Sequence, residues 1–152
     1  MKAVVQRVSS ASVIVSGKTV GSIDKGLLVY LGVEREDTEA DLDYMVRKIP
    51  NIRMFTDGEG KMNLSVGDVG GQLLVVSQFT LCADMRKGNR PSFNPAAEPK
   101  MAETMYLRFV EKVRNKGYVV ETGEFGASMK VGYVNEGPVT LIIDTRENMK
   151  QN

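Results

Sequence analysis

The feature that most constrains the fold is a continuous apolar run, GLLVYLGV, from Gly26 to Val33. Because this run shows no polar alternation, it predicts a central strand of a sheet. A second apolar run, Leu73–Val76, follows the pair Gly70-Gly71 and predicts another buried strand. With 152 residues, the chain is large enough to bury such a sheet within one domain, without metals or disulfides.

Shorter strands are predicted around these two runs. Residues 2–8 are mostly apolar and predict a strand. Ser12–Ser16 and Thr19–Ile23 alternate polar with apolar residues on either side of Gly17-Lys18, which predicts a hairpin with its turn at that pair. The sequence TDGEG, residues 56–60, predicts a turn between two further short strands.

Two helices are predicted where the apolar period changes. Thr38 and Asp41 have the spacing of a capping box, and one buried helix face follows, formed by Leu42, Met45, Val46 and Ile49. Pro50 should end or kink this helix. The second helix is predicted to begin near Pro95–Pro99 and to end at Gly117, with an apolar stripe of Met101, Met105, Phe109 and Val113.

The last strands are predicted near Ser128–Val134 and Val139–Asp144, on either side of the sequence NEGP. No repeat, linker or composition break divides the chain. The sequence therefore predicts one α+β domain, residues 1–145, with a mostly antiparallel sheet. Residues 146–152 form a polar tail, and the end TRENMKQN is expected to fray.

Composition excludes several classes of enzyme. The chain has no histidine, so it has no Ser-His-Asp triad, no HExxH zinc site and no imidazole acid or base. Its single cysteine, Cys82, excludes an intrachain disulfide. Because a catalytic cysteine usually has a histidine partner, Cys82 is interpreted as a small, half-buried hydrophobic residue.

The amino-terminal residues lack the run of about 7 to 15 apolar residues of a signal peptide, and no run approaches the roughly 20 needed to span a bilayer. We therefore expect a cytoplasmic protein with no membrane partner. A net charge of +1 argues against an extended nucleic-acid-binding surface with many phosphate contacts. The basic sequence RKGNR, Arg86–Arg90, is the best candidate for a local contact with an acidic polymer, and a solvated loop is its alternative interpretation.

Two short motifs do not fit a purely structural interpretation. SQFTL, Ser77–Leu81, places two hydroxyls directly after a buried strand, although the chain has no histidine to activate them. NEGPVT, Asn135–Thr140, predicts only a turn when it is taken alone. Three further motifs accompany them: QRVSSASV at residues 6–13, GKMNL at 60–64 and RPSF at 90–93.

Together, in this order and at this spacing, the five motifs closely resemble the D-aminoacyl-tRNA deacylases, and the match extends from Met1 to about Asp144. The resemblance implies hydrolysis of the ester that joins a D-amino acid to the terminal adenosine of tRNA, without cofactor or metal. It also implies a β-barrel-like sheet with helices packed on one side, and a homodimer. Each active site would combine SQFTL from one subunit with Gly137-Pro138 from the other.

The substrate ester is already activated, and the neighbouring ribose hydroxyl can assist the attacking water. The enzyme then needs to stabilise an oxyanion, which backbone N–H groups can do without a titratable side chain. We expect the amides of Phe79 and Thr80 to bind the ester carbonyl. Ser77, Gln78 and the Phe79 ring are expected to shape the pocket for the terminal adenosine.

The resemblance also implies a device for chirality. Gly137-Pro138 would have a cis peptide bond whose carbonyl oxygens bind the substrate ammonium in the partner's pocket and exclude the side chain of an L-residue. Glycyl-tRNA would then also be hydrolysed. Arg7 would orient this dipeptide, with a surface or interface salt bridge as its alternative role.

Further substrate contacts follow from the same resemblance. Phe125 and Met129 would line the adenosine pocket, and ordinary packing in the core is the alternative role of each. Arg86 and Arg90 could meet acceptor-stem phosphates, with a weak dependence on salt.

Other function classes remain open from sequence alone. One is a Ser or Thr hydrolase with a lysine base, for which no lysine has a motif spacing. Another is an RNA-end-binding or dimerisation module that performs no chemistry. A third is deacylation assisted by a magnesium ion held by carboxylates.

Overall fold

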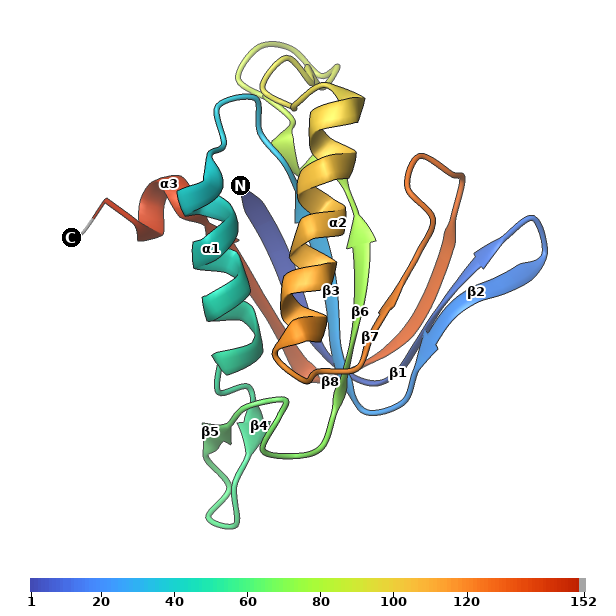
Figure 1. Ribbon diagram of the computed structural model, residues 1–152, viewed down its shortest axis with the longest axis vertical. Helices are drawn as coiled ribbons and strands as arrows, with labels where there is room; N and C mark the ends of the chain where they lie inside the picture. Colours follow the sequence, from blue (N-terminus) through green and yellow to red (C-terminus); the bar gives the residue numbers. More distant parts are fainter. Residues whose placement is uncertain (151–152) are drawn as a thin grey trace.

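The computed structural model describes residues 1–150. These residues form eight strands: β1 Lys2–Val15, β2 Lys18–Ile23, β3 Gly26–Gly32, β4 Phe55–Thr56, β5 Met62–Leu64, β6 Gln72–Ser77, β7 Val120–Thr122 and β8 Lys130–Asp144 (Figure 1). The helices are α1 Glu39–Lys48, α2 Pro99–Asn115 and α3 Thr145–Asn148, with two 3-10 turns, η1 Ile49–Asn51 and η2 Phe79–Cys82.

Six strands form one mixed sheet. Its hydrogen-bonded order is β2-β1-β3-β6-β7, and β8 pairs with β1 along nearly the whole of that long strand. β1 pairs antiparallel with β2, β3 and β8, whereas β6 is parallel to both β3 and β7. Since β2 also lies against β6 and β7, the sheet curls into a nearly closed, barrel-like form. The predicted α+β domain with a mostly antiparallel sheet is confirmed.

The amino-terminal strands differ from the prediction in two details. The strands predicted at 2–8 and 12–16 are one continuous strand of 14 residues, with an irregular register between Val8 and Ser10. In a regular strand the side chains of Val8 and Ala11 would lie on opposite faces, because they are an odd number of residues apart. The bulge places both in the same buried cluster. The hairpin turn is Ser16-Gly17 rather than Gly17-Lys18, and its φ angles of 49° and 77° are those of a type I′ turn.

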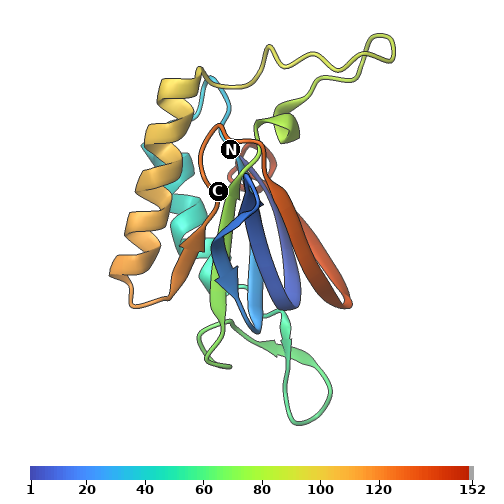
Figure 2. The same ribbon diagram turned by 90° about the vertical axis from the view of Figure 1, so that its right-hand side faces the viewer.

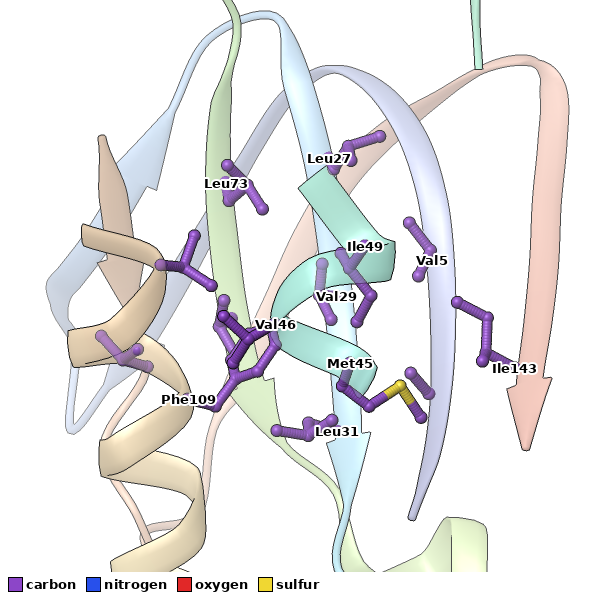
Figure 3. Close-up of a cluster of buried hydrophobic side chains, with 14 of the residues drawn as sticks. Val5, Leu27, Val29, Leu31, Met45, Val46, Ile49, Leu73, Phe109 and Ile143 are labelled. Atoms are coloured by element: carbon purple, nitrogen blue, oxygen red, sulfur yellow. The ribbon is translucent and has the colours of Figure 1, made fainter. Parts of the chain in front are cut away.

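Helices α1 and α2 cover one face of the sheet (Figure 2). The predicted capping box of Thr38 and Asp41 begins α1, and its predicted apolar face is buried. Figure 3 shows how side chains of both helices meet those of β1, β3, β6 and β8 in one core, formed by Val5, Leu27, Val29, Leu31, Met45, Val46, Ile49, Leu73, Phe109 and Ile143 among others. Gly117 follows α2 with φ of +97°, as expected of a helix C-cap.

The second face of the sheet buries a smaller apolar cluster, formed by Val8, Ala11, Val13, Ile23, Leu28, Leu74 and Val76. Met129 and Val131 pack against this cluster and are only partly buried. Side chains at the start of β8 and just before it therefore border the end of β6, where SQFTL begins. The parallel strand β7 was not predicted, because its three residues give no periodic signal.

The carboxyl-terminal end is ordered further than expected. Residues Thr145–Asn148 form α3 rather than fraying. Thr145 is fully buried and accepts a hydrogen bond of 2.8 Å from the amino group of Met1. Residues 151 and 152 of the predicted tail lie outside the described residues. No helix within residues 1–150 is both long and apolar enough to cross a membrane.

Candidate active site

The SQFTL motif lies where β6 passes into η2. The strand ends at Ser77, and the backbone N–H of Gln78 donates to the carbonyl of Leu31 on β3, at 2.9 Å. Leu81 N–H donates back to Gln78 at 3.2 Å and closes the 3-10 turn. Within residues 1–150, the amides of Phe79 and Thr80 have no such acceptor, because the first N–H groups of a helix lack intrahelical partners.

A cavity of about 560 Å³ opens beside this motif. It contains the predicted residues Ser77, Gln78, Phe79, Phe125 and Met129. The other lining residues are Val33, Val76, Phe93, Ala96, Ala97, Pro99, Ala102, Gly126, Ala127 and Val131. None of the described residues that line this cavity carries a titratable side chain. The cavity can therefore hold an apolar or aromatic ligand, but it offers no side-chain acid or base.

Two aromatic pairs border the cavity. Phe79 is 54% exposed, and its ring meets that of Phe93 edge to face, with centroids 5.1 Å apart. Phe125, which also lines the cavity, packs against Tyr106, whose hydroxyl donates to the carbonyl of Val75 at 2.8 Å. Burial raises the pKa of Tyr106 to about 12. Phe93 was not predicted as a site residue, although it belongs to RPSF, one of the five motifs that carry the family resemblance.

The two hydroxyls of the motif have different surroundings. Ser77 lines the cavity, whereas Thr80 does not. The side-chain amide of Gln78 donates a hydrogen bond to Thr80 Oγ1. Thr80 is therefore oriented by its own motif, and none of the described lysines lines the cavity beside it.

The NEGPVT motif is not a turn between two strands, as its sequence suggested, but a loop within the single strand β8. Gln6 of β1 pairs with Thr140, and Val8 pairs with Asn135, so one residue of β1, Arg7, faces the four residues 136–139. The Gly137-Pro138 bond is cis. Neither Gly137 nor Pro138 lines the cavity beside SQFTL.

Arg7 is directed at this loop. Its Nε donates to the carbonyl of Glu136 at 3.1 Å, and its Nη1 donates to the carbonyl of Met54 at 2.8 Å. Among the described residues, Arg7 forms no salt bridge, and it borders a second cavity of about 380 Å³ together with Glu136. Its two shortest hydrogen bonds are therefore to backbone carbonyls, and Nη1 also lies 3.4 Å from the hydroxyl of Thr56.

The basic loop lies between η2 and α2, in the segment that projects from the top of the molecule in Figure 2. The Arg86 side chain is 88% exposed and pairs with Asp84, at 2.7 Å. This partner holds the pKa of the Asp84 carboxyl well below its usual range, at about 2. Within residues 1–150, Arg90 makes no salt bridge, so a neighbouring carboxylate offsets the charge of Arg86 but not that of Arg90.

Cys82 is buried beneath the motif, and burial raises the pKa of its thiol to about 11. It is therefore a packing residue, as the sequence indicated, although it is fully buried rather than half-buried, and it is not a thiolate nucleophile. Within residues 1–150, no three Cys, Asp or Glu side chains gather in a way that could hold a metal ion.

Comparison with known proteins gives one consistent family. A family model described as D-Tyr-tRNA(Tyr) deacylase matches residues 4–144. The chain is 56% identical to the D-aminoacyl-tRNA deacylase of Thermosipho melanesiensis, over 97% of this chain and 99% of that one. It is 59% identical to the enzyme of the same name from Desulfitobacterium hafniense, with the same coverage.

Two solved structures share the fold. One is titled c-Myc DNA Unwinding Element Binding Protein; it has a TM-score of 0.89 and 46% identity over 95% of this chain and 98% of its own. The other, titled a probable eukaryotic D-amino acid tRNA deacylase, has a TM-score of 0.80 and 20% identity over 93% of this chain and 97% of its own. The chain belongs to the D-aminoacyl-tRNA deacylase family, and its reaction is hydrolysis of the ester bond of D-aminoacyl-tRNA.

Proposed function

We propose that this enzyme hydrolyses its ester through backbone oxyanion stabilisation and substrate assistance, without an enzymic acid, base or metal. The observation that carries the proposal is a cavity with no titratable side chain in its lining, which lies beside a 3-10 turn whose first two amides, those of Phe79 and Thr80, donate no backbone hydrogen bond within residues 1–150. The amides of Phe79 and Thr80 bind the carbonyl oxygen as it becomes negative. Fixed donors of this kind typically supply about 2.7 to 4 kcal/mol each.

The remaining chemistry comes from the substrate. The vicinal ribose hydroxyl of the terminal adenosine assists the attacking water, and the ester bond then breaks to free tRNA and D-amino acid. The adenosine lies in the apolar cavity, where the Phe79 ring, Phe125 and Met129 contact the base, and Ser77 and Gln78 supply polar groups. Apolar cavities with a few convergent polar groups are the usual form of small-ligand sites.

Chiral selection is performed in trans by Gly137-Pro138 of a partner subunit. Their two carbonyl oxygens accept hydrogen bonds from the substrate ammonium and occupy the space that an L-side chain would need. Glycine, which has no side chain to exclude, is therefore also released from its tRNA. Arg7 holds the loop in position through the carbonyl of Glu136.

A homodimer completes this site. The dipeptide does not line its own cavity, and β8 presents exposed apolar side chains beside it: Val134 is 54% exposed and Ile142 is 79% exposed. A second copy that covers β8 would bury these side chains and bring each loop to the other cavity. Arg86 and Arg90, on the projecting loop, contact phosphates of the acceptor stem. Arg90 contributes more to this contact, because the charge of Arg86 is partly offset by Asp84.

The experiment that tests this function is deacylation of matched D-tyrosyl-tRNA, L-tyrosyl-tRNA and glycyl-tRNA by the purified enzyme, with EDTA present throughout. We expect rapid release from the D-ester and the glycyl ester and only very slow release from the L-ester. Equal release from D and L would refute the Gly-Pro filter, and loss of activity in EDTA would favour the magnesium mechanism. Binding without release would favour an RNA-end-binding module.

Thr80→Ala separates backbone from side-chain chemistry. Because a backbone donor survives this substitution, single-turnover deacylation should keep a substantial fraction of its rate. A loss of several orders of magnitude in a folded variant would instead make Thr80 the nucleophile or a proton carrier.

Mixed dimers test the division of labour between subunits. One subunit carries Phe79→Ala and the other carries Pro138→Ala, so that each homodimer is impaired at both sites. In the mixed dimer, one site combines the intact SQFTL segment of one subunit with the intact Gly-Pro loop of the other, and D-selective activity should return. Failure of stable mixed dimers to recover that activity would contradict a site shared in trans.

A further inference from the structure

The loop that carries Gly137-Pro138 is closed by side chains rather than by the sheet. Pairing between β1 and β8 stops at Thr140 on one side of the loop and at Asn135 on the other, and it includes none of residues 136–139. These four residues protrude opposite a single residue of β1. A loop of this kind needs other contacts to fix its direction.

Asn135 spans the neck of this loop. Its Nδ2 donates to the carbonyl of Arg7 at 3.0 Å and to the carbonyl of Val139 at 3.0 Å. Both acceptors are carbonyl oxygens, which cannot donate, so the group that faces them must be the amide NH₂. A single side chain therefore joins β1 to both ends of the loop, and it uses both of its donor hydrogens.

The amide is itself held on its other side. Thr140 Oγ1 lies 3.5 Å from Asn135 Oδ1, and Gln6 Nε2 donates to the same hydroxyl at 3.1 Å. A series of side-chain contacts thus extends from β1 across the neck of the loop, from Gln6 through Thr140 to Asn135. Asn135 is half-buried, and its bonds to the carbonyls of Arg7 and Val139 are partly buried, whereas the two contacts of Thr140 are exposed.

The four loop carbonyls now divide into two kinds. The outer two, of Glu136 and Val139, are bound by Arg7 and by Asn135 respectively. The inner two, of Gly137 and Pro138, receive no hydrogen bond from any side chain within residues 1–150 and take no part in the pairing with β1. Hydrogen bonds therefore hold the residues on both sides of the dipeptide and leave the carbonyl oxygens of Gly137 and Pro138 without a donor among the described residues.

We infer that Asn135 is a positioning residue for chiral selection: it fixes the direction of the Gly137 and Pro138 carbonyls, as Arg7 does from the other side. This inference rests on the proposed function of the dipeptide as the chiral filter. Asn135 does not touch the substrate. Its effect is therefore on the ratio of D-ester to L-ester hydrolysis more than on folding or on tRNA affinity.

Asn135→Asp is the sharpest test, because it keeps the shape and removes both donors. Asn135→Ala removes the same two donors without adding a charge. It tests the positioning role of Asn135 if the Asp variant does not fold. The matched control is Asn51→Asp, since Asn51 Nδ2 donates to the carbonyl of Arg47 at 2.8 Å on the helical side of the molecule. Each dimer is assayed with D-tyrosyl-tRNA and L-tyrosyl-tRNA, and its melting temperature is measured.

We expect the D-to-L ratio of kcat/KM to fall about 10- to 100-fold in the Asn135 variants, because misplacement of positioning groups by about 1 Å can cost 100-fold. Hydrolysis of the L-ester should rise, the KM for the D-ester should change little, and Asn51→Asp should behave as wild type. An unchanged ratio in folded Asn135→Ala would overturn the inference, as would a loss of activity on both esters in parallel.

Pro138→Ala, assayed alongside, distinguishes the two levels of the argument. If it lowers the ratio while the Asn135 variants do not, the filter stands and the role of Asn135 is refuted. If Pro138→Ala also leaves the ratio unchanged, the proposed filter itself fails, and the positioning role fails with it.

Discussion

Gly32→Ala tests whether the position of the SQFTL backbone sets the rate. A Cβ at Gly32 would lie 3.0 Å from the carbonyl oxygen of Gln78, 3.1 Å from Leu81 Cβ and 3.2 Å from Cys82 Sγ. Two of these atoms belong to the same 3-10 turn as the proposed oxyanion amides, and all three contacts are tight. An ordinary contact begins near 3.4 Å, so the segment must move by about 0.4 Å, which is 3.4 minus 3.0.

The expected size of the effect follows from this displacement. If 1 Å of misplacement costs about 100-fold, then 0.4 Å costs roughly 5- to 10-fold, and it should appear in kcat because the amides act on the transition state. Overpacking should also lower the free energy of unfolding by about 1 to 3 kcal/mol. Gly58→Ala is the control, because its Cβ would meet no atom within 4 Å.

The assay is single-turnover deacylation of D-tyrosyl-tRNA together with urea unfolding of each variant. An unchanged kcat in a Gly32→Ala enzyme that remains folded would refute the reasoning. So would a rise in KM alone, because that result would mean that the packed segment binds the substrate without acting on the transition state.

Three further outcomes are expected. Tyr106→Phe should lose about 0.5 to 1.5 kcal/mol of stability at pH 7 in urea unfolding. Because its folded pKa, about 12, exceeds its unfolded value near 10, the stability that Tyr106 contributes is complete below pH 10 and is lost as pH rises toward 12, so the variant's deficit should narrow over that range. Gly123→Ala places a Cβ 2.6 Å from Met129 Sδ, which must swing aside, so the KM for D-aminoacyl-tRNA should rise a few-fold with a smaller change in kcat. The Cys82 thiol, 1% exposed and with a pKa of about 11, should not react with a thiol reagent at pH 8 until the protein unfolds, and rapid labelling of native protein would contradict its burial.

The sequence alone determined most of the elements, because their signals are local. The run from Gly26 to Val33, the capping box at Thr38 and the two apolar helix stripes each depend on a few neighbouring residues, and each formed as expected. The absence of histidine likewise restricted the chemistry before any fold was known.

Only the tertiary structure decided how these pieces combine. The parallel pairing of β6 with β3 and β7 joins segments far apart in the chain, which no local pattern encodes. The NEGPVT motif was expected to be a turn, but pairing with β1 on both sides makes it a loop within one strand. Asn135 and Phe93 gain their contacts from distant segments, at Arg7 and Phe79 respectively, and so gave no signal as individual residues. Long-range pairing creates the site, because its donors and walls come from segments that meet only when the sheet closes.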